Sequence, residues 1–277
     1  MIEDIQKNNN KIMNEHNNQG LTYFEGYSPV EIQYLLYDTF GNYSPIKLLK
    51  LQDLEYQSIP ILNQVKYITN LIDKQGELKL TNKGFLPTKI VADIYKQGFL
   101  KDELIELRIS KLYKETDSIT INLTKILLEL SGIVKKRHNK LSLTRTGKKI
   151  ISNNHQLLLN IFKTFGQKFN WAYFDGYGEN NIGQLGFGFS LILLSKYGDK
   201  RQIDRFYSKK YFQAFPDLKD NMTKTNYGIG RPSDCYSIRT FDRFLDYFGL
   251  IKIDTDKFIT KTELYDRLIK CTPHNTQ

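Results

Sequence analysis

The stretch of residues 128–147, LELSGIVKKRHNKLSLTRTG, decides which fold the sequence predicts. It begins in an apolar helix that ends at Gly132. The runs IVKKR and KLSLT then alternate apolar and polar residues, as strands with one buried face do. The link His138-Asn139 between them is short enough for a tight hairpin. The segment TRTGKKII starts a further helix, so the predicted order is helix, hairpin, helix.

Two other stretches repeat this pattern. They are residues 71–84, LIDKQGELKLTNKG, and residues 245–262, LDYFGLIKIDTDKFITKT. A helix packed against a small twisted hairpin, inside a bundle of about three helices, is the arrangement of winged helix-turn-helix domains. The sequence therefore resembles the winged-helix superfamily over residues 118–151 and 227–270, and more weakly over residues 58–98. An ordinary α+β domain with hairpins between its helices is the alternative.

The remaining pattern is mostly helical. We therefore expect a mainly α fold with small β-hairpins (α+β), built from repeated winged-helix-like units in two lobes. Residues 1–20 are polar and rich in asparagine, which predicts a flexible arm, with a short helix in it as the alternative. Residues 21–152 are expected to form an N-terminal lobe with one or two such units. Residues 153–277 are expected to form a C-terminal lobe with a helical core and a terminal unit.

The chain is strongly basic. It has 40 Lys and Arg against 30 Asp and Glu, a formal charge of +10 and a pI of about 9.3. Both halves share the excess, with 22 bases and 17 acids in residues 1–150 and 18 bases and 13 acids in residues 151–277. A basic protein accumulates near polyanions because binding releases counterions. A bias toward Lys, Asn, Ile and Tyr, common in AT-rich genomes, is the alternative explanation.

Several classes of protein are excluded or disfavoured. The best apolar run, Phe187–Leu194, is far shorter than the roughly 20 residues of a membrane span. The start MIEDIQKNNN lacks the pattern of a signal peptide. Cys235 and Cys271 cannot build a disulfide scaffold or a cysteine-only zinc site. The sequence has no HExxH, CxxC, EF-hand or Walker motif. We expect a soluble cytoplasmic protein without a metal or cofactor and without a membrane partner.

The cations gather in three places. The densest group lies in residues 135–149, which contain no acid, and a second group in residues 196–210 is mixed with acids. A looser third group comprises Lys224, Arg231, Arg239 and Arg243. Ten residues are the candidate nucleic-acid contacts: Lys135, Lys136, Arg137, Lys140, Arg145, Lys148, Lys149, Arg231, Arg239 and Arg243. A solvated basic face is the simplest alternative for any one group.

The two better repeats differ in how they could bind nucleic acid. In residues 118–151 the hairpin carries the cations, whereas the preceding helix offers only Lys125 and Thr124. This unit suits backbone contact more than base reading. In residues 227–270, the helix that follows Arg231 places Arg239 and Arg243 at helical spacing. Arginine suits guanine edges, so this helix is the predicted reader. Pairing with neighbouring aspartates is the alternative.

One stretch could hold an enzyme site. Asp175 and Glu179 lie among aromatic residues in NWAYFDGYGENNIGQLGFGF, where two acids could bind an ion, a sugar or a base. A turn with aromatic residues in the core is the alternative. The pattern favours a non-enzymatic protein and assigns no catalytic residue.

A likeness covers most of the chain. The segments GYSPVEIQYLLYDTF, NYSPIKL, LKLTNKGFLPTKIV, GIVKKRHNKLSLT and NWAYFDGYGENNIGQLGFG resemble uncharacterised bacterial proteins of the Bacteroidetes type, a family related to SEC-C-motif proteins. The Cys-rich SEC-C motif itself is absent here. The resemblance implies a bacterial source and no known activity.

These observations lead to three functional hypotheses. The first is a nucleic-acid-binding winged-helix protein, with DNA favoured over RNA, acting as a transcription regulator or accessory factor of a mobile element or an antiviral defence system. The second is an adaptor that uses winged helices to dock a protein partner. The third is an enzyme with a site around Asp175–Glu179. A homodimer is left open.

Overall fold

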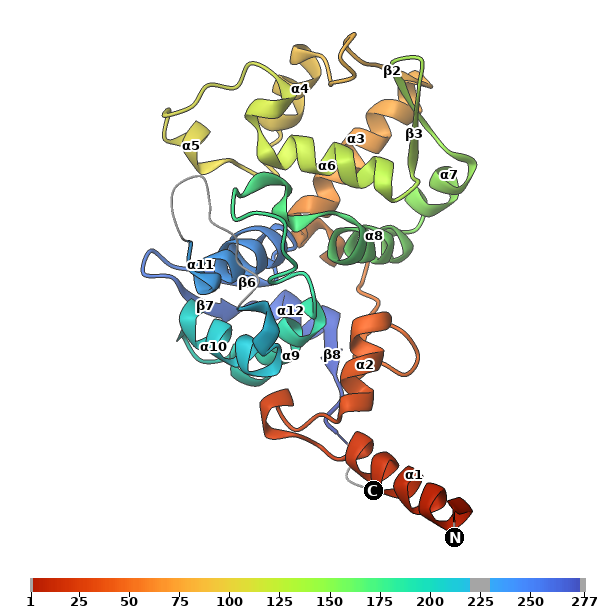
Figure 1. Ribbon diagram of the computed structural model, residues 1–277. Helices are drawn as coiled ribbons and strands as arrows, with labels where there is room; N and C mark the ends of the chain where they lie inside the picture. Colours follow the sequence, from red (N-terminus) through yellow and green to blue (C-terminus); the bar gives the residue numbers. More distant parts are fainter. Residues whose placement is uncertain (1, 220–229, 275–277) are drawn as a thin grey trace. The chain divides into compact units, whose positions relative to one another are not determined.

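The computed structural model describes residues 2–219 and 230–274, without the side chains of residues 2–5. Lys224 and the other residues of 220–229 lie outside the described part. The fold is mainly helical with small antiparallel sheets, which confirms the predicted class (Figure 1). The chain forms two compact units. The inserted unit comprises residues 50–174 and 247–249, and the terminal unit comprises residues 1–49, 175–246 and 250–277.

The inserted unit is a small helical bundle with one sheet. Its elements in chain order are η2 (Glu55–Ser58), α3 (Pro60–Gln75), β2 (Leu78–Lys79), α4 (Thr88–Lys96), α5 (Glu103–Glu106), η3 (Glu115–Asp117), α6 (Ile119–Leu130), β3 (Val134–Arg137), β4 (Lys140–Leu143), α7 (Arg145–Ile151), α8 (Asn154–Lys163), η4 (Thr164–Lys168) and η5 (Trp171–Phe174).

The sheet of this unit has the strand order β2-β4-β3, and both pairs are antiparallel. Leu141 of β4 lies opposite Leu78 of β2 and is fully buried, so one face of the sheet joins the core. His138 and Asn139 both have left-handed backbones, with φ of 48° and 54°. Two such residues make the tight turn that favours a right-twisted hairpin, which confirms the predicted link.

The terminal unit is assembled from distant parts of the chain. Its elements are α1 (Ile2–Asn18), η1 (Thr22–Phe24), α2 (Pro29–Tyr37), β1 (Ile46–Leu48), α9 (Phe187–Tyr197), β5 (Gln202–Ile203), α10 (Asp204–Ala214), η6 (Pro216–Leu218), α11 (Pro232–Ser237), η7 (Ile238–Leu245), β6 (Ile251–Ile253), β7 (Phe258–Lys261), α12 (Glu263–Leu268) and β8 (Ile269–Cys271).

Two sheets hold this unit together. One has the strand order β5-β7-β6, and the other pairs β1 with β8. In the second sheet Ile46 lies opposite Cys271, which joins an early segment of the chain to a late one. The units therefore divide the chain differently from the predicted boundary at residue 152. That boundary assumed that neighbours in sequence pack together, and the pairing of β1 with β8 overrides this tendency.

The two units repeat one order of elements. In the inserted unit α3, β2, α4, α6, β3 and β4 run helix, strand, helix, helix, strand, strand. In the terminal unit α9, β5, α10, α11 with η7, β6 and β7 run in the same order. Each sheet places its third strand between the first and the second. The weak third repeat expected at residues 58–98 is not a separate unit, because its strand β2 completes the sheet of β3 and β4.

Candidate nucleic-acid interface

The outer face of the sheet in the inserted unit carries a row of cations. Arg137 of β3 lies opposite Lys140 of β4, and Lys140 lies opposite Lys79 of β2. Lys135, two residues before Arg137, shares their face because side chains alternate along a strand. All four side chains are exposed. Like charges directly opposite each other destabilise a sheet, so this row suits a surface that meets an anion.

Lys79 was missed as a candidate site residue. The alternation of Leu78 and Leu80 in GELKLTNKG already predicts that Lys79 faces away from the core. The missing information was the pairing of β2 with β4, which joins strands that are far apart in the sequence. The register of β2 against β4 therefore adds Lys79 to the basic surface, and the composition of the chain could not show this.

Glu77 is the one acid that the described residues place in contact with this row. Its carboxylate accepts a hydrogen bond of 2.7 Å from the Lys140 ammonium. This hydrogen bond and the charge of Lys140 lower the pKa of Glu77, and Lys135 adds a smaller effect of the same sign. Both partners are exposed, so solvent screens the pair. The row keeps a clear excess of positive charge.

Lys136 lies on the opposite face of the hairpin. Its register partner is Leu141, and its ammonium lies against Gly84, which has a left-handed backbone with φ of 81°. A side chain at residue 84 would collide with this ammonium. Lys136 is nevertheless exposed and extends the positive charge toward the turn at residues 82–84.

Helix α7 continues the basic surface along the chain. Arg145, Lys148 and Lys149 are spaced three and four residues apart, which places them on one helical face, and all are exposed. Thr144 fixes the start of the helix, because its hydroxyl accepts from the Gly147 N–H at 2.8 Å and donates to the Gly132 carbonyl at 2.7 Å. The helix is therefore anchored to the base of the hairpin.

Seven predicted contacts are thus exposed on two consecutive hairpin strands and the helix that follows them. They are Lys135, Lys136, Arg137, Lys140, Arg145, Lys148 and Lys149. Within residues 2–219 and 230–274, an ion pair with a carboxylate involves Lys140 and none of the other six.

Helix α6 is the helix from which the sequence pattern predicts contacts to DNA, but it is covered. Lys125, one of the two residues that could have reached DNA, is buried and lies 3.3 Å from the Glu115 carboxylate. It also donates to the Gly84 carbonyl at 2.9 Å. Glu115 itself is fully buried and accepts from the Asn122 amide at 2.6 Å. The segment before α6 therefore closes over it, and Thr124 is buried as well.

Arg239 requires a correction, because it is buried and not at a surface. Only 1% of the residue is exposed, and its guanidinium forms an ion pair with the Asp175 carboxylate. It also donates to the Asn180 carbonyl and side-chain oxygen, each at 2.8 Å, and to the Gly178 carbonyl at 3.2 Å. These bonds fix the loop of residues 175–182 against η7. The guanidinium has no remaining route to a base edge.

The other two predicted arginines of this unit differ in exposure. Arg231 is exposed at the start of α11 and pairs with Asp234 at 2.9 Å. Arg243 is half-buried in η7. The structure does not bring them into one cationic surface with Arg239.

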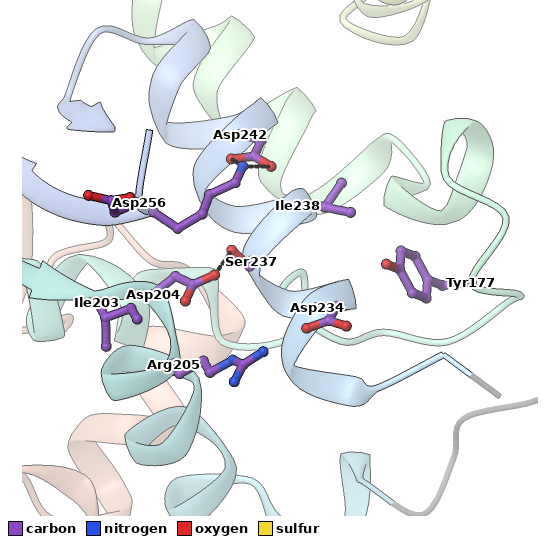
Figure 2. A pocket seen from close by; sticks show the side chains of 10 residues that line it. Tyr177, Ile203, Asp204, Arg205, Asp234, Ser237, Ile238, Asp242 and Asp256 are labelled. Atoms are coloured by element: carbon purple, nitrogen blue, oxygen red, sulfur yellow. Dashed lines mark hydrogen bonds and ion pairs between the residues drawn. The ribbon is translucent and has the colours of Figure 1, made fainter. Parts of the chain in front are cut away.

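Acids outnumber bases in the lining of a cleft beside α11 and η7, where Arg205 and Lys257 are the two cations. The cleft has a volume of about 600 Å³ (Figure 2). Asp234, Ile238 and Asp242 line it at intervals of four residues. Asp204 also lines it and accepts from the Ser237 hydroxyl at 2.6 Å. Asp234 and Asp242 are themselves paired, with Arg231 and Lys257, so this helix offers phosphate a less cationic surface than the hairpin of the inserted unit does.

The hairpin of the terminal unit is also neutralised by its own acids. In the inserted unit the hairpin cations face solvent, whereas here most are paired. Lys257 bonds Asp242, Arg201 pairs with Asp254 and Asp256, and Lys261 pairs with Asp199 and Asp266. The mixed group of residues 196–210 follows the same trend, since Lys196 and Lys210 both pair with Glu25.

The two acids of the possible enzyme site serve different purposes. The Asp175 side chain is 1% exposed and holds Arg239, whereas Glu179 is exposed. Asn180 is also engaged by Arg239. Asp175 is therefore a structural counter-ion in this arrangement.

In the described ranges, no three or more His, Cys, Asp or Glu side chains form a group that could hold a metal ion. Among the same residues, no helix has the length and apolar character to cross a membrane.

Comparison with known proteins relates part of the chain to a described family. Residues 57–156 match the family model described as the Y4jL N-terminal domain. The matched range spans the sheet, the basic hairpin and α7, together with the helices around them. The match shows no link to the winged-helix superfamily or to SEC-C-motif proteins. No curated protein and no solved structure matches the chain.

Proposed function

We propose that the inserted unit is a winged-helix-like module that binds the backbone of nucleic acid, with DNA favoured over RNA. Its order of helices and strands, and the third strand placed centrally in the sheet, support this interpretation. The hairpin of β3 and β4 would then be the wing. The observation that carries the proposal is the exposed row Lys79, Lys140 and Arg137.

The proposed binding is largely independent of sequence. Phosphate contacts position a protein on DNA, whereas base contacts carry the sequence information. The cations of this module lie on the wing and α7, and α6 is covered by its own chain. An accessory factor of a mobile element or a defence system fits such binding better than a regulator of one operator.

Charge reversal on the wing tests this proposal. We expect Lys135→Glu with Arg137→Glu to weaken binding to a labelled 20-base-pair duplex by about tenfold or more, because two phosphate contacts become repulsive. Fluorescence anisotropy at several salt concentrations measures the affinity. Duplexes of unrelated sequence should lose affinity to the same degree.

Lys252→Glu is the matched control. Lys252 of β6 is exposed and lies opposite Thr260 of β7. Lys135 of β3 lies opposite Ser142 of β4 in the same way. It should leave the affinity unchanged, while Lys135→Glu alone should lower it. No binding to DNA at low salt, or equal losses for the two single variants, would contradict the proposal.

The terminal unit favours a second function, that of a protein adaptor. It repeats the same order of elements, yet most of its hairpin cations are paired, and acids outnumber bases in the cleft beside α11 and η7. Such a surface suits a basic protein segment better than a polyanion. If the adaptor role is the sole function, the chain will bind no DNA and the wing variants will behave like the wild type.

A further inference from the structure

A second cleft, of about 910 Å³, lies in the terminal unit and belongs to none of the surfaces described above. The end of α1, the start of α2, the loop at residues 42–45 and the C-terminal residues 272–274 surround it. Its walls come from both ends of the described chain. The cleft therefore depends on contacts that hold these ends together.

Several hydrogen bonds build these walls. The pairing of β1 with β8 aligns the two ends, and the Thr272 N–H donates to the Pro45 carbonyl at 2.8 Å. The His274 ring nitrogen Nδ1 lies 2.7 Å from the Glu31 carboxylate. The same carboxylate accepts from the Ser28 N–H at 2.8 Å and so caps α2. The floor of the cleft is thus defined by the fold.

Two stacked tyrosines form an aromatic platform in the cleft. The rings of Tyr34 and Tyr43 lie 5.2 Å apart with an interplanar angle of 30°. Both line the cleft, and the residues are 42% and 77% exposed. Exposed aromatic rings that gather in a cleft mark a candidate binding surface. A planar ligand would extend this stack.

The polar lining indicates an uncharged ligand. The amide side chains of Asn18, Gln19 and Asn42 supply both donors and acceptors. The Lys47 ammonium is engaged by the carbonyls of Gly41 and Asn42, at 2.5 and 2.8 Å. It is therefore not directed at a phosphate.

The acidic side chains that line the cleft also favour an uncharged ligand. Glu15 and Glu31 both line the cleft against one Lys, Lys47, so the two carboxylates outweigh it and disfavour an anionic ligand.

We propose that this cleft binds a nucleoside, with its base stacked on Tyr43 and the edge of the base hydrogen-bonded by the amides. Aromatic side chains stack on bases of any sequence, and amides match the donor and acceptor pattern of a base edge. A nucleoside has the planar ring and lacks the phosphate charge that the two glutamates oppose. This site is separate from the basic wing, and the inference does not depend on the proposed function.

Calorimetric titration with adenosine, guanosine, cytidine and uridine tests the proposal. We expect at least one of them to bind saturably. Tyr43→Ala should weaken its binding by about 5- to 150-fold, in line with the loss of one stacking ring. Tyr43→Phe should retain most of the affinity because the ring remains. Adenosine monophosphate should bind more weakly than adenosine because of the two carboxylates.

Tyr37→Ala is the matched control, because Tyr37 lies on the same helix as Tyr34, is 80% exposed and does not line the cleft. It should bind nucleosides as the wild type does. The proposal is overturned if none of the four nucleosides binds, or if Tyr37→Ala weakens binding as much as Tyr43→Ala. Equal binding of glucose or maltose would also overturn it, since a sugar site needs no planar base. Circular dichroism of each variant verifies that the fold is retained.

Discussion

Arg239 connects η7 to a loop that has little regular structure of its own. Its guanidinium donates to Asp175, Gly178 and Asn180, which follow one another closely in the sequence. The side chains of Arg239 and Asp175 are both buried, so each charge depends on the other for its solvation. The sequence shows an arginine at helical spacing, but it gives no sign that the partner lies far earlier in the chain, at Asp175.

Replacing Arg239 should destabilise the protein strongly. Arg239→Met leaves the Asp175 carboxylate buried without a counter-ion, and we expect a loss of about 3–5 kcal/mol in the free energy of unfolding. Urea denaturation followed by circular dichroism measures this loss. The double variant Arg239→Met with Asp175→Leu should be less destabilised than the single one, because no unpaired charge remains.

An exposed pair provides the comparison for this experiment. Arg267 and Glu263 are one helical turn apart, and both side chains are largely exposed. Arg267→Met should cost at most about 1 kcal/mol. An Arg239→Met variant as stable as Arg267→Met would show that the buried pair contributes little.

At the scale of elements, the sequence predicts the hairpins well and the exposure of helices poorly. The alternation in residues 133–144 and the two-residue link are local signals, and the structure confirms both. Whether a helix is covered depends on distant residues. The sequence pattern predicts that Lys125 of α6 reaches nucleic acid, but the contact of Lys125 with Glu115, ten residues earlier, buries it.

Gly147 shows how closely α7 approaches the hairpin. A side chain at this position would overlap the carbonyl group of Ile133, whose carbon lies 2.8 Å from the added Cβ. Gly147→Ala must therefore push α7 away from the base of β3. We expect a loss of about 1–3 kcal/mol in the free energy of unfolding, the usual range for overpacking. Thermal or urea denaturation measures it.

The neighbouring residue supplies the control. Thr146 lies in the same turn of α7 and is exposed, so Thr146→Ala should change stability by less than about 0.5 kcal/mol. A neutral Gly147→Ala would mean that α7 is free to move relative to the hairpin. The cations of α7 would then have no fixed place beside the wing.

At the scale of the whole molecule, two units repeat one order of elements but differ in their charge. The inserted unit exposes its hairpin cations, whereas most of those in the terminal unit are paired with acids. The net charge of +10 predicts neither arrangement, because composition does not say which cation meets which acid. The division into units could not be predicted from the sequence either, because it depends on the pairing of β1 with β8, which are far apart in the chain.

The salt dependence of DNA binding measures how many of these cations reach phosphates. The logarithm of the binding constant falls with the logarithm of the salt concentration, with a slope of about −0.9 for each phosphate neutralised on duplex DNA. If the row across the sheet acts as a unit, Lys79→Ala and Lys135→Ala should each reduce the steepness of this slope by about 0.9. Lys252→Ala, in the other unit, should leave the slope unchanged. A slope that responds to Lys135 and not to Lys79 would confine binding to the hairpin, because the two residues differ chiefly in the strand that carries them.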